Sequence, residues 1–147
     1  MTRKCLEKHY SLLISIEKTT KLITKLYNRQ NIVADSVRAS SRQKPFQESV
    51  ITISGLDYRS QQRETRLNQM LNKQTAKLHT LGQEIEDYLD TVEDSDIYLI
   101  IELRYMSALS WRDVTNLVYN EDADESAPLK ALDRYLEARQ TASDDVS

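Results

Sequence analysis

The sequence predicts a mainly all-α protein: a long antiparallel helical hairpin, similar to a coiled coil, with a short loop or β insertion, followed by a C-terminal helix-turn-helix. Three observations predict this class. Only two glycines and two prolines interrupt the 147 residues, which favours long helices. Apolar residues recur at alternating steps of three and four on both sides of a central break. Short amphipathic segments separated by polar turns then follow, so we divide the chain into residues 1–92, 93–140 and a disordered tail, 141–147.

The first predicted helix covers residues 3–29. Its apolar stripe consists of Leu6, His9, Leu13, Ile16, Thr20, Ile23 and Tyr27. This spacing places all of them on one face of a helix. Lysines occupy the remaining positions, which is typical of a solvated face, and direct contact of these lysines with nucleic acid is the alternative.

The helical period stops between residues 31 and 57. Serines, Pro45 and Gly55 interrupt this segment, and Val50-Ile51-Thr52-Ile53 is β-prone. The pattern predicts a loop with one or two short strands at the tip of a helical pair. A structural cap is the main interpretation, and a contact loop for a partner is the alternative.

The second long helix is predicted from about Tyr58 to Val92. Its heptad seam consists of Leu67, Leu71, Gln74, Leu78, Leu81, Ile85, Tyr88 and Val92. A seam of this length needs a partner, which is either the helix at residues 3–29, folded back antiparallel, or a second copy of the chain in a homodimer. Gln74 is the polar member of the seam and is expected to fix its register.

The segment 93–140 contains signals for three helix starts. Acidic residues at positions 93, 94 and 96 suit the positive end of a helix dipole. Ser110 is the expected N-cap of the next helix, with Asp113 in a capping box, and Ser126 is expected to cap the last one. The inner stripe of the middle helix consists of Trp111, Val114, Leu117 and Val118. Arg104 is expected to pair with a neighbouring carboxylate.

Charge is distributed unevenly along the chain. Residues 1–44 hold ten Lys/Arg and three Asp/Glu, a net charge of +7, whereas residues 83–147 hold five and seventeen, a net charge of −12. Either the two regions attract one another or each meets a different partner. A basic surface attracts nucleic acid and an acidic surface repels it.

Several classes of protein do not suit this composition. Cys5 is the only cysteine, so neither a disulfide framework nor a cysteine zinc site is expected. The longest apolar run, Ile97–Ile101, is too short to span a bilayer, and the N-terminus does not resemble a signal peptide, so we expect a soluble, cytoplasmic protein without a membrane partner. The two histidines are isolated and no glycine-rich phosphate loop occurs, so we expect no metal, no cofactor and no enzymatic activity.

Particular residues of the C-terminal half carry a resemblance to a known family. They are Leu103-Arg104-Tyr105, Leu109-Ser110-Trp111 and Val114. This block resembles the helix-turn-helix in region 4 of bacterial sigma factors. It is closer to the phage-encoded RinA/ArpU-type transcriptional regulators of Gram-positive bacteria, a subset of which is also similar upstream, around the segment 35–55.

The resemblance implies a phage transcriptional regulator that binds double-stranded DNA in the host cytoplasm, with the last helix as the reader. The early residues of a recognition helix contact base edges in the major groove. Here those positions are Ala127, Lys130, Ala131 and Arg134, and Arg112 of the preceding helix is available for a phosphate.

The acidic turn between the last two helices supports a different class of function. Glu121, Asp122, Asp124 and Glu125 lie where each would repel phosphate. If the chain binds DNA, basic residues of the N-terminal half must supply much of the affinity. The alternative is a protein-interaction module whose acidic surface binds or inhibits a host nucleic-acid-binding protein, such as RNA polymerase or a defence factor.

Overall fold

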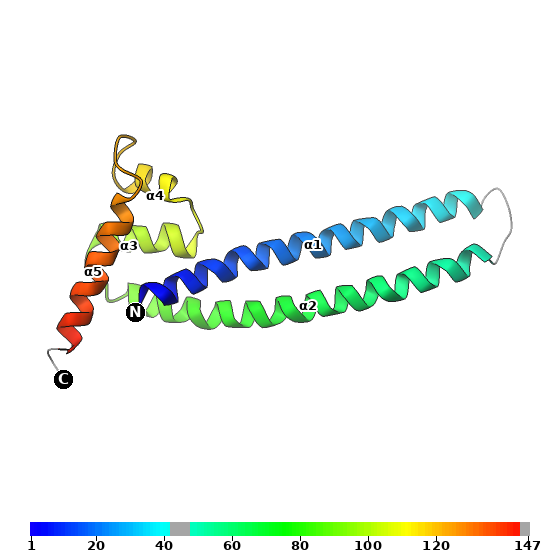
Figure 1. Cartoon of the computed structure of the whole chain (residues 1–147), viewed down its shortest axis with the longest axis horizontal. Coiled ribbons are helices and arrows are strands. Elements are labelled where there is room, and N and C mark those ends of the chain that lie inside the picture. Colours follow the sequence, from blue (N-terminus) through cyan, green and yellow to red (C-terminus); the bar gives the residue numbers. More distant parts are fainter. Residues whose placement is uncertain (42–47, 145–147) are drawn as a thin grey trace. The chain divides into compact units, whose positions relative to one another are not determined.

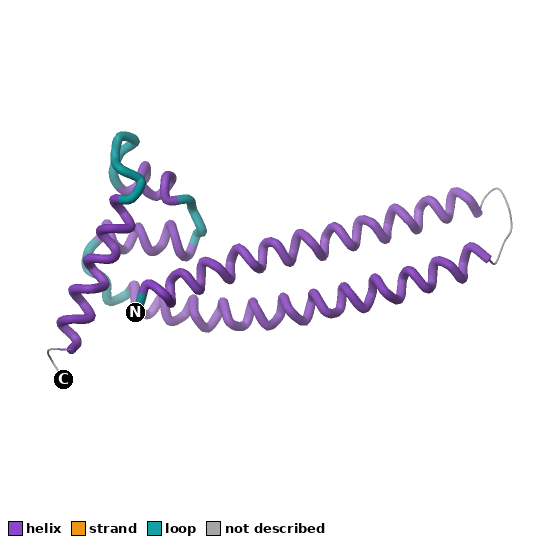
Figure 2. Tube along the Cα trace, viewed as in Figure 1, coloured by secondary structure: helices purple, strands orange, loops and turns teal. Residues whose placement is uncertain are grey.

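The computed structural model describes the backbone of residues 1–41 and 48–144 and the side chains of residues 1–29 and 58–143. The described backbone is mainly helical and contains no strand. Its elements are α1 (Arg3–Ser41), α2 (Glu48–Leu89), α3 (Ser95–Ile101), the π-helix η1 (Glu102–Met106), α4 (Trp111–Val118) and α5 (Ala127–Asp144) (Figures 1 and 2). The all-α class is therefore confirmed. No helix in the described ranges has both the length and the apolar character needed to cross a membrane.

The loop and strands predicted for residues 31–57 are wrong wherever the backbone is described. Residues 31–41 continue α1, and residues 48–57, including the β-prone Val50–Ile53, form the first turns of α2. Residues 42–47 of the predicted loop lie outside the described residues. Helix propensities of ordinary residues differ by no more than about 0.7 kcal/mol, and glycine costs about 1 kcal/mol, so two long helices can extend through weakly unfavourable residues.

The boundaries near two other segments also differ. The helix predicted to reach Val92 ends at Leu89, where the Thr91 hydroxyl donates to the Tyr88 carbonyl at 2.7 Å and closes the last turn. The tail predicted from residue 141 begins later, because α5 continues to Asp144. Residues 145–147 lie outside the described residues. Helix ends are set by such local hydrogen bonds, which apolar periodicity does not report.

The chain forms two compact units, and one of them consists of residues 15–75. Within this unit α1 and α2 lie side by side and meet at a polar cluster. Gln74 donates from Nε2 to the Ser15 hydroxyl at 2.7 Å, and the Thr19 hydroxyl lies 3.4 Å from the Gln74 Oε1 atom. Thr19 is buried, whereas Thr20 and Tyr27, expected on the apolar stripe, are exposed. The buried face of α1 therefore includes Thr19, whose hydroxyl also donates to the Ser15 carbonyl at 2.9 Å.

The other unit consists of residues 1–14 and 76–147. Its buried core comprises Leu6, Ile85, Leu89, Ile97, Ile100, Ile101, Tyr105, Val114, Leu132 and Leu136. These residues come from all six helical elements, and both α3 and α4 pack against α5. The core therefore joins the first turns of α1 and the last turns of α2 to the C-terminal helices.

His9 connects α1 to the end of η1. Its Nδ1 atom lies 2.9 Å from the Tyr105 carbonyl oxygen. Because a carbonyl only accepts hydrogen bonds, Nδ1 is the protonated nitrogen and donates. Gly82 makes room for the ring, since a Cβ atom at this position would lie 3.3 Å from the Nε2 atom of His9. The last carbonyls of a helix need partners from outside the helix, and here a buried histidine supplies one.

Candidate nucleic-acid interface

Ser110 is the N-cap of α4, as predicted, but Asp113 pairs with the Ser110 hydroxyl and not with its backbone N–H, so the predicted capping box forms only in part. The Ser110 hydroxyl accepts from the Asp113 N–H at 3.2 Å and donates to the Asp113 carboxylate at 2.6 Å. The previous helix has its own cap, because Asp94 accepts from the N–H groups of Asp96 and Ile97 at 2.9 and 3.2 Å. Both predicted helix starts are confirmed. They fix the direction in which α4 leaves the turn after η1.

Arg104 orients α4 by a contact that the sequence reading did not anticipate. Its guanidinium carbon lies 4.1 Å from the centroid of the Tyr10 ring and 4.8 Å from that of the Trp111 ring. The same group donates to the Leu109 carbonyl at 2.7 Å. The expected pairing with a carboxylate is therefore wrong. Arginine stacks on aromatic faces because its delocalised charge is weakly hydrated, and two rings flank it here.

The connection from α4 to α5 is held by hydrogen bonds around Asp124. The Asp124 carboxylate accepts from the Ser126 N–H at 3.1 Å and from the Ser126 hydroxyl at 2.7 Å. These two hydrogen bonds, the hydroxyl first, lower the pKa of Asp124, and Lys130 lowers it further. Ser126 stands at the start of α5, and its carbonyl accepts the Lys130 N–H at 3.0 Å. Its hydroxyl, however, donates to Asp124, so Asp124 is the acceptor that orders this turn.

Two cationic side chains outside the turn hold α5 in place. Arg3 of α1 donates to the Asp133 carboxylate at 2.9 Å. Arg139 donates from its two terminal nitrogens to the hydroxyl and the carbonyl of Thr91, both at 2.9 Å. Each contact joins α5 to another segment of the same unit. The inward face of α5 is the one that carries the buried Leu132 and Leu136.

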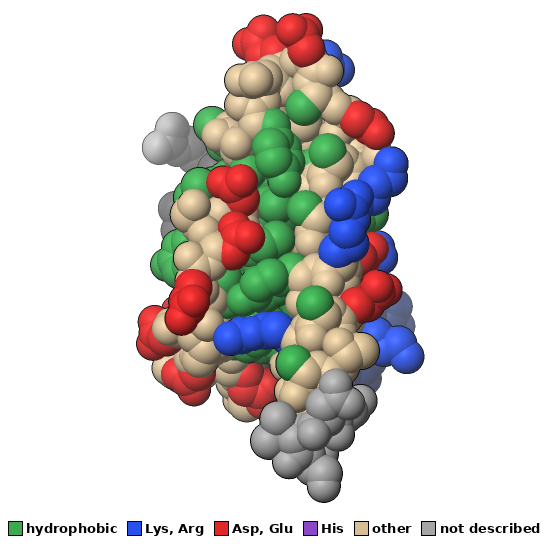
Figure 3. Space-filling view, turned by 90° about the vertical axis from the view of Figure 1, so that its left-hand side faces the viewer, with side chains coloured by type: hydrophobic (Ala, Val, Ile, Leu, Met, Phe, Trp, Pro, Cys, Tyr) green, Lys and Arg blue, Asp and Glu red, His purple; other side chains and the backbone are tan. Residues whose placement is uncertain are grey.

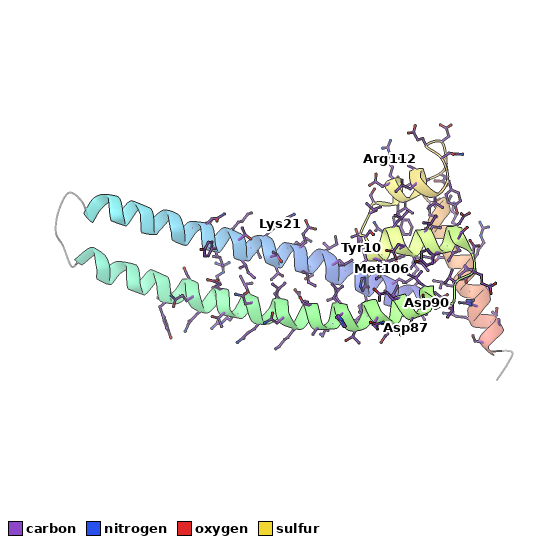
Figure 4. The ribbon with its side chains drawn as sticks, turned by 180° about the vertical axis from the view of Figure 1, so that it is seen from behind. Tyr10, Lys21, Asp87, Asp90, Met106 and Arg112 are labelled. Atoms are coloured by element: carbon purple, nitrogen blue, oxygen red, sulfur yellow. The ribbon has the colours of Figure 1, made fainter. Side chains whose placement is uncertain are left out.

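Lys130 and Arg134 lie on the outward face of α5, one turn apart, and both are exposed. Lys130 also forms an exposed ion pair with Asp124, with 3.5 Å between Nζ and Oδ2. Ala131 is half-buried and packs against the core, so it offers less surface than its neighbours. Arg112 is exposed on α4 (Figure 4). Lys130 and Arg134 thus share one face of α5, and Arg112 is a separate exposed cation on α4.

Tyr119, at the end of α4, lies within electrostatic range of Arg134. Burial raises the pKa of Tyr119, Asp96 and Asp94 raise it further, and Arg134 lowers it.

The four acidic residues of the turn, Glu121, Asp122, Asp124 and Glu125, are all exposed. Acidic side chains gather at the tip formed by this turn, at the top of Figure 3. A shallow depression of about 310 Å³ lies beside it, lined by Trp111, Asp124, Glu125, Ser126 and Leu129. The candidate surface thus combines a short row of cations with a strongly acidic edge.

The charge separation seen along the sequence follows the two units. Residues 1–14 and 76–147 hold nine Lys/Arg and eighteen Asp/Glu, a net charge of −9. Residues 15–75 hold eleven and five, a net charge of +6. The unit that contains α4 and α5 is therefore the acidic one.

The sequence predicted the exposed residues of the α4–α5 surface better than the residues that hold these helices in place. The predicted elements do contain His9, Arg104 and Asp124. Their contacts, with the Tyr105 carbonyl, the Tyr10 ring and the Ser126 N–H, were not predicted. An apolar period locates such residues but does not identify their partners. Only Asp124 had a local signal, because an Asp side chain commonly accepts from the backbone N–H two residues later, here that of Ser126.

Comparisons with known proteins identify no relative, since no family model, no curated protein and no solved structure matches this chain.

Proposed function

We propose that the chain is a phage transcriptional regulator that binds double-stranded DNA through a sigma-region-4-like helix-turn-helix formed by α4 and α5. In this proposal α5 enters the major groove and α3 supports the pair. The long helices α1 and α2 form an antiparallel hairpin that carries this unit. The RinA/ArpU-type regulators are the family it resembles.

The observation that carries the proposal is the outward face of α5. Lys130 and Arg134 are exposed one turn apart near the start of that helix, above a core that includes Val114, Leu132 and Leu136. The early, outward residues of a recognition helix are those that reach base edges. Arg112 on α4 is exposed and suits a phosphate contact, which positions a helix without reading sequence.

Binding of selected and random duplexes tests this proposal. Fluorescence anisotropy of the full chain is measured with duplexes enriched from a random pool and with an unselected duplex, from low to physiological salt. We expect Arg134→Ala and Lys130→Ala each to weaken binding of the enriched duplex about tenfold and to reduce its preference over the random one. Lys8→Ala, which removes one exposed charge from α1, is the matched control and should preserve the preference. Equal losses in all three variants would argue against α5 as the reader.

The exposed acidic turn favours a second candidate function, a protein-interaction module for a basic host protein. The net charge of −9 on this unit supports it, because phosphate is repelled and a basic partner is attracted. Under this candidate, no duplex binds at any salt concentration, and RNA polymerase or another host nucleic-acid-binding protein binds instead. A Glu121→Gln, Asp122→Asn, Glu125→Gln variant should then lose the partner, while Asp124 is kept because it orders the start of α5.

A further inference from the structure

One face of α2 carries cations at a regular helical spacing. Arg59, Arg63, Arg66 and Lys73 follow one another at steps of four, three and seven, with Met70 at the position between the last two. Such steps keep residues on a single face of an α-helix. All five side chains are exposed, and all lie in the unit of residues 15–75. We call the four cations the α2 stripe.

The stripe is unfavourable for the helix that carries it. Arg59 and Arg63 are four residues apart, and Arg63 and Arg66 are three apart, so like charges are neighbours. Like charges at these spacings destabilise a helix. No ion pair between described residues involves a member of the stripe. Among the described side chains, no carboxylate forms an ion pair that would offset this repulsion.

On the facing helix, α1, a charged side chain does form an ion pair. On α1, Lys21, which is labelled in Figure 4, forms an ion pair with Glu17, four residues earlier, in the arrangement that stabilises a surface helix. This pair also lowers the pKa of Glu17 through the hydrogen bond from Lys21. The absence of such pairing on the α2 stripe is therefore a property of that face and not of the whole unit.

The surroundings of Arg66 are polar and contain no carboxylate among the residues that form them. Arg66 borders a depression of about 360 Å³ whose other lining residues are Tyr58, Gln61, Gln62, Thr65 and Gln69. Tyr58 is 62% exposed, and its hydroxyl accepts from the Gln62 amide at 2.9 Å. Amide and hydroxyl groups beside arginine are the kinds of group that contact phosphate and sugar.

We propose that the α2 stripe binds the phosphate backbone of duplex DNA and supplies sequence-independent affinity that the acidic α4–α5 surface lacks. Lys73 lies 14 positions after Arg59, so the stripe is about 21 Å long at 1.5 Å per position, and duplex DNA offers one charge per about 1.7 Å of its axis. Arginine presents a planar fork of donors that matches phosphate oxygens, and three of the four cations are arginines. This inference rests on the proposed DNA binding. It assigns the sequence-independent affinity for DNA to α2 and the sequence selectivity to α5.

The test removes three charges from the stripe and, separately, three from the facing helix. The stripe variant is Arg59→Gln, Arg63→Gln, Arg66→Gln, and the control is Lys18→Gln, Lys25→Gln, Arg29→Gln, whose positions are exposed on α1. Glutamine has a helix propensity close to those of arginine and lysine, and circular dichroism checks that both variants fold. Anisotropy with a random duplex is measured over a range of salt concentrations.

We expect the stripe variant to lower the slope of log K against log salt by about 2.7, which corresponds to three phosphate contacts. It should weaken enriched and random duplexes equally, so that the preference between them is unchanged. The control should change this slope by less than about 0.9, the value that corresponds to one phosphate contact. A third variant with lysine at the three arginine positions keeps the charge and should retain most of the slope.

Several results would overturn the inference. They are an unchanged slope in the stripe variant, the same loss in the control, tighter binding of single-stranded RNA than of duplex DNA, or a stripe variant that alters only self-association in the analytical ultracentrifuge. Failure of the proposed function looks different. A wild-type chain that binds random duplex through the stripe but shows no preference for any enriched sequence refutes the reader role of α5 and leaves the stripe standing. No duplex binding by the wild type at any salt refutes both.

Discussion

The two units of this chain differ in how completely they bury their side chains and in the sign of their net charge. In the unit of residues 1–14 and 76–147, helices of different directions enclose a set of fully buried apolar side chains and carry a net charge of −9. In the unit of residues 15–75, Thr19 is the only buried side chain among those described, and the net charge is +6. Two units with the same helical period are thus stabilised by different interactions. Enclosure stabilises the first unit, whereas a half-buried seam and a polar cluster stabilise the second.

The largest expected effect is the difference in unfolding free energy between a leucine truncation in one unit and a leucine truncation in the other. Leu132→Ala removes a fully buried side chain and should lower the free energy of unfolding by about 3 kcal/mol. Leu71→Ala removes a half-buried one and should cost about 1 kcal/mol. Hydrogen exchange measured by mass spectrometry resolves the protection of each unit. Equal costs would show that the seam of residues 15–75 is as well enclosed as the core.

Replacing Arg104 should lower the stability of the first unit by an intermediate amount. Arg104→Met keeps most of the side-chain volume but removes both ring contacts and the hydrogen bond to Leu109, and should cost about 2 kcal/mol. Urea unfolding followed by Trp111 fluorescence measures the loss, and the native emission should shift to the red. Arg112→Met, at an exposed position of the next helix, is the control and should cost less than about 0.5 kcal/mol. Similar costs for both would mean that Arg104 contributes only its charge.

Disrupting the polar cluster of residues 15–75 should lower the free energy of unfolding by a smaller amount. Gln74→Ala leaves the Ser15 hydroxyl without the amide that donates to it and should cost about 1 kcal/mol. Hydrogen exchange should rise in residues 15–29 and 58–75 and stay unchanged around α5. Thr75→Ala, an exposed neighbour, serves as the control. If protection of α5 fell as much as that of the seam, the two units would not unfold independently.

The turn before α5 should give the smallest effect, visible as a local pH dependence. The pKa of Asp124 is lowered because the Ser126 hydroxyl and N–H donate to its carboxylate. A lowered folded-state pKa contributes stability that is present above the unfolded value of about 3.9 and is lost as pH falls through the folded value. Carboxyl NMR should show a higher pKa for Asp124 in Ser126→Ala, and the start of α5 should fray at acidic pH. Ser11→Ala on α1 should leave this titration unchanged, and a response of the same size there would disprove the assignment.

The fold class followed from local rules, and the departures arose where distant residues meet. The caps at Asp94 and Ser110 were predictable because a cap depends on residues two or three positions away. The helical course of residues 31–41 and 48–57 was not predictable, because weak local preferences favoured a loop there. Of the candidate site, helical spacing predicted that Lys130 and Arg134 share a face of α5. The ion pair between Lys130 and Asp124 and the packing of Ala131 against the core required the tertiary structure.

By itself, the sequence determined the helical class, the starts of α3 and α4, the polar position at Gln74 and the opposite charges of the two regions. Each of these depends on residue type and on spacing within a few turns of helix, which the sequence states directly. The tertiary structure decided that Arg104 lies between Tyr10 and Trp111, that His9 meets the carbonyl of Tyr105, and that Thr19 is buried in place of Thr20. Partners of this kind are far apart along the chain, and apolar periodicity specifies which face is buried but not what it is buried against.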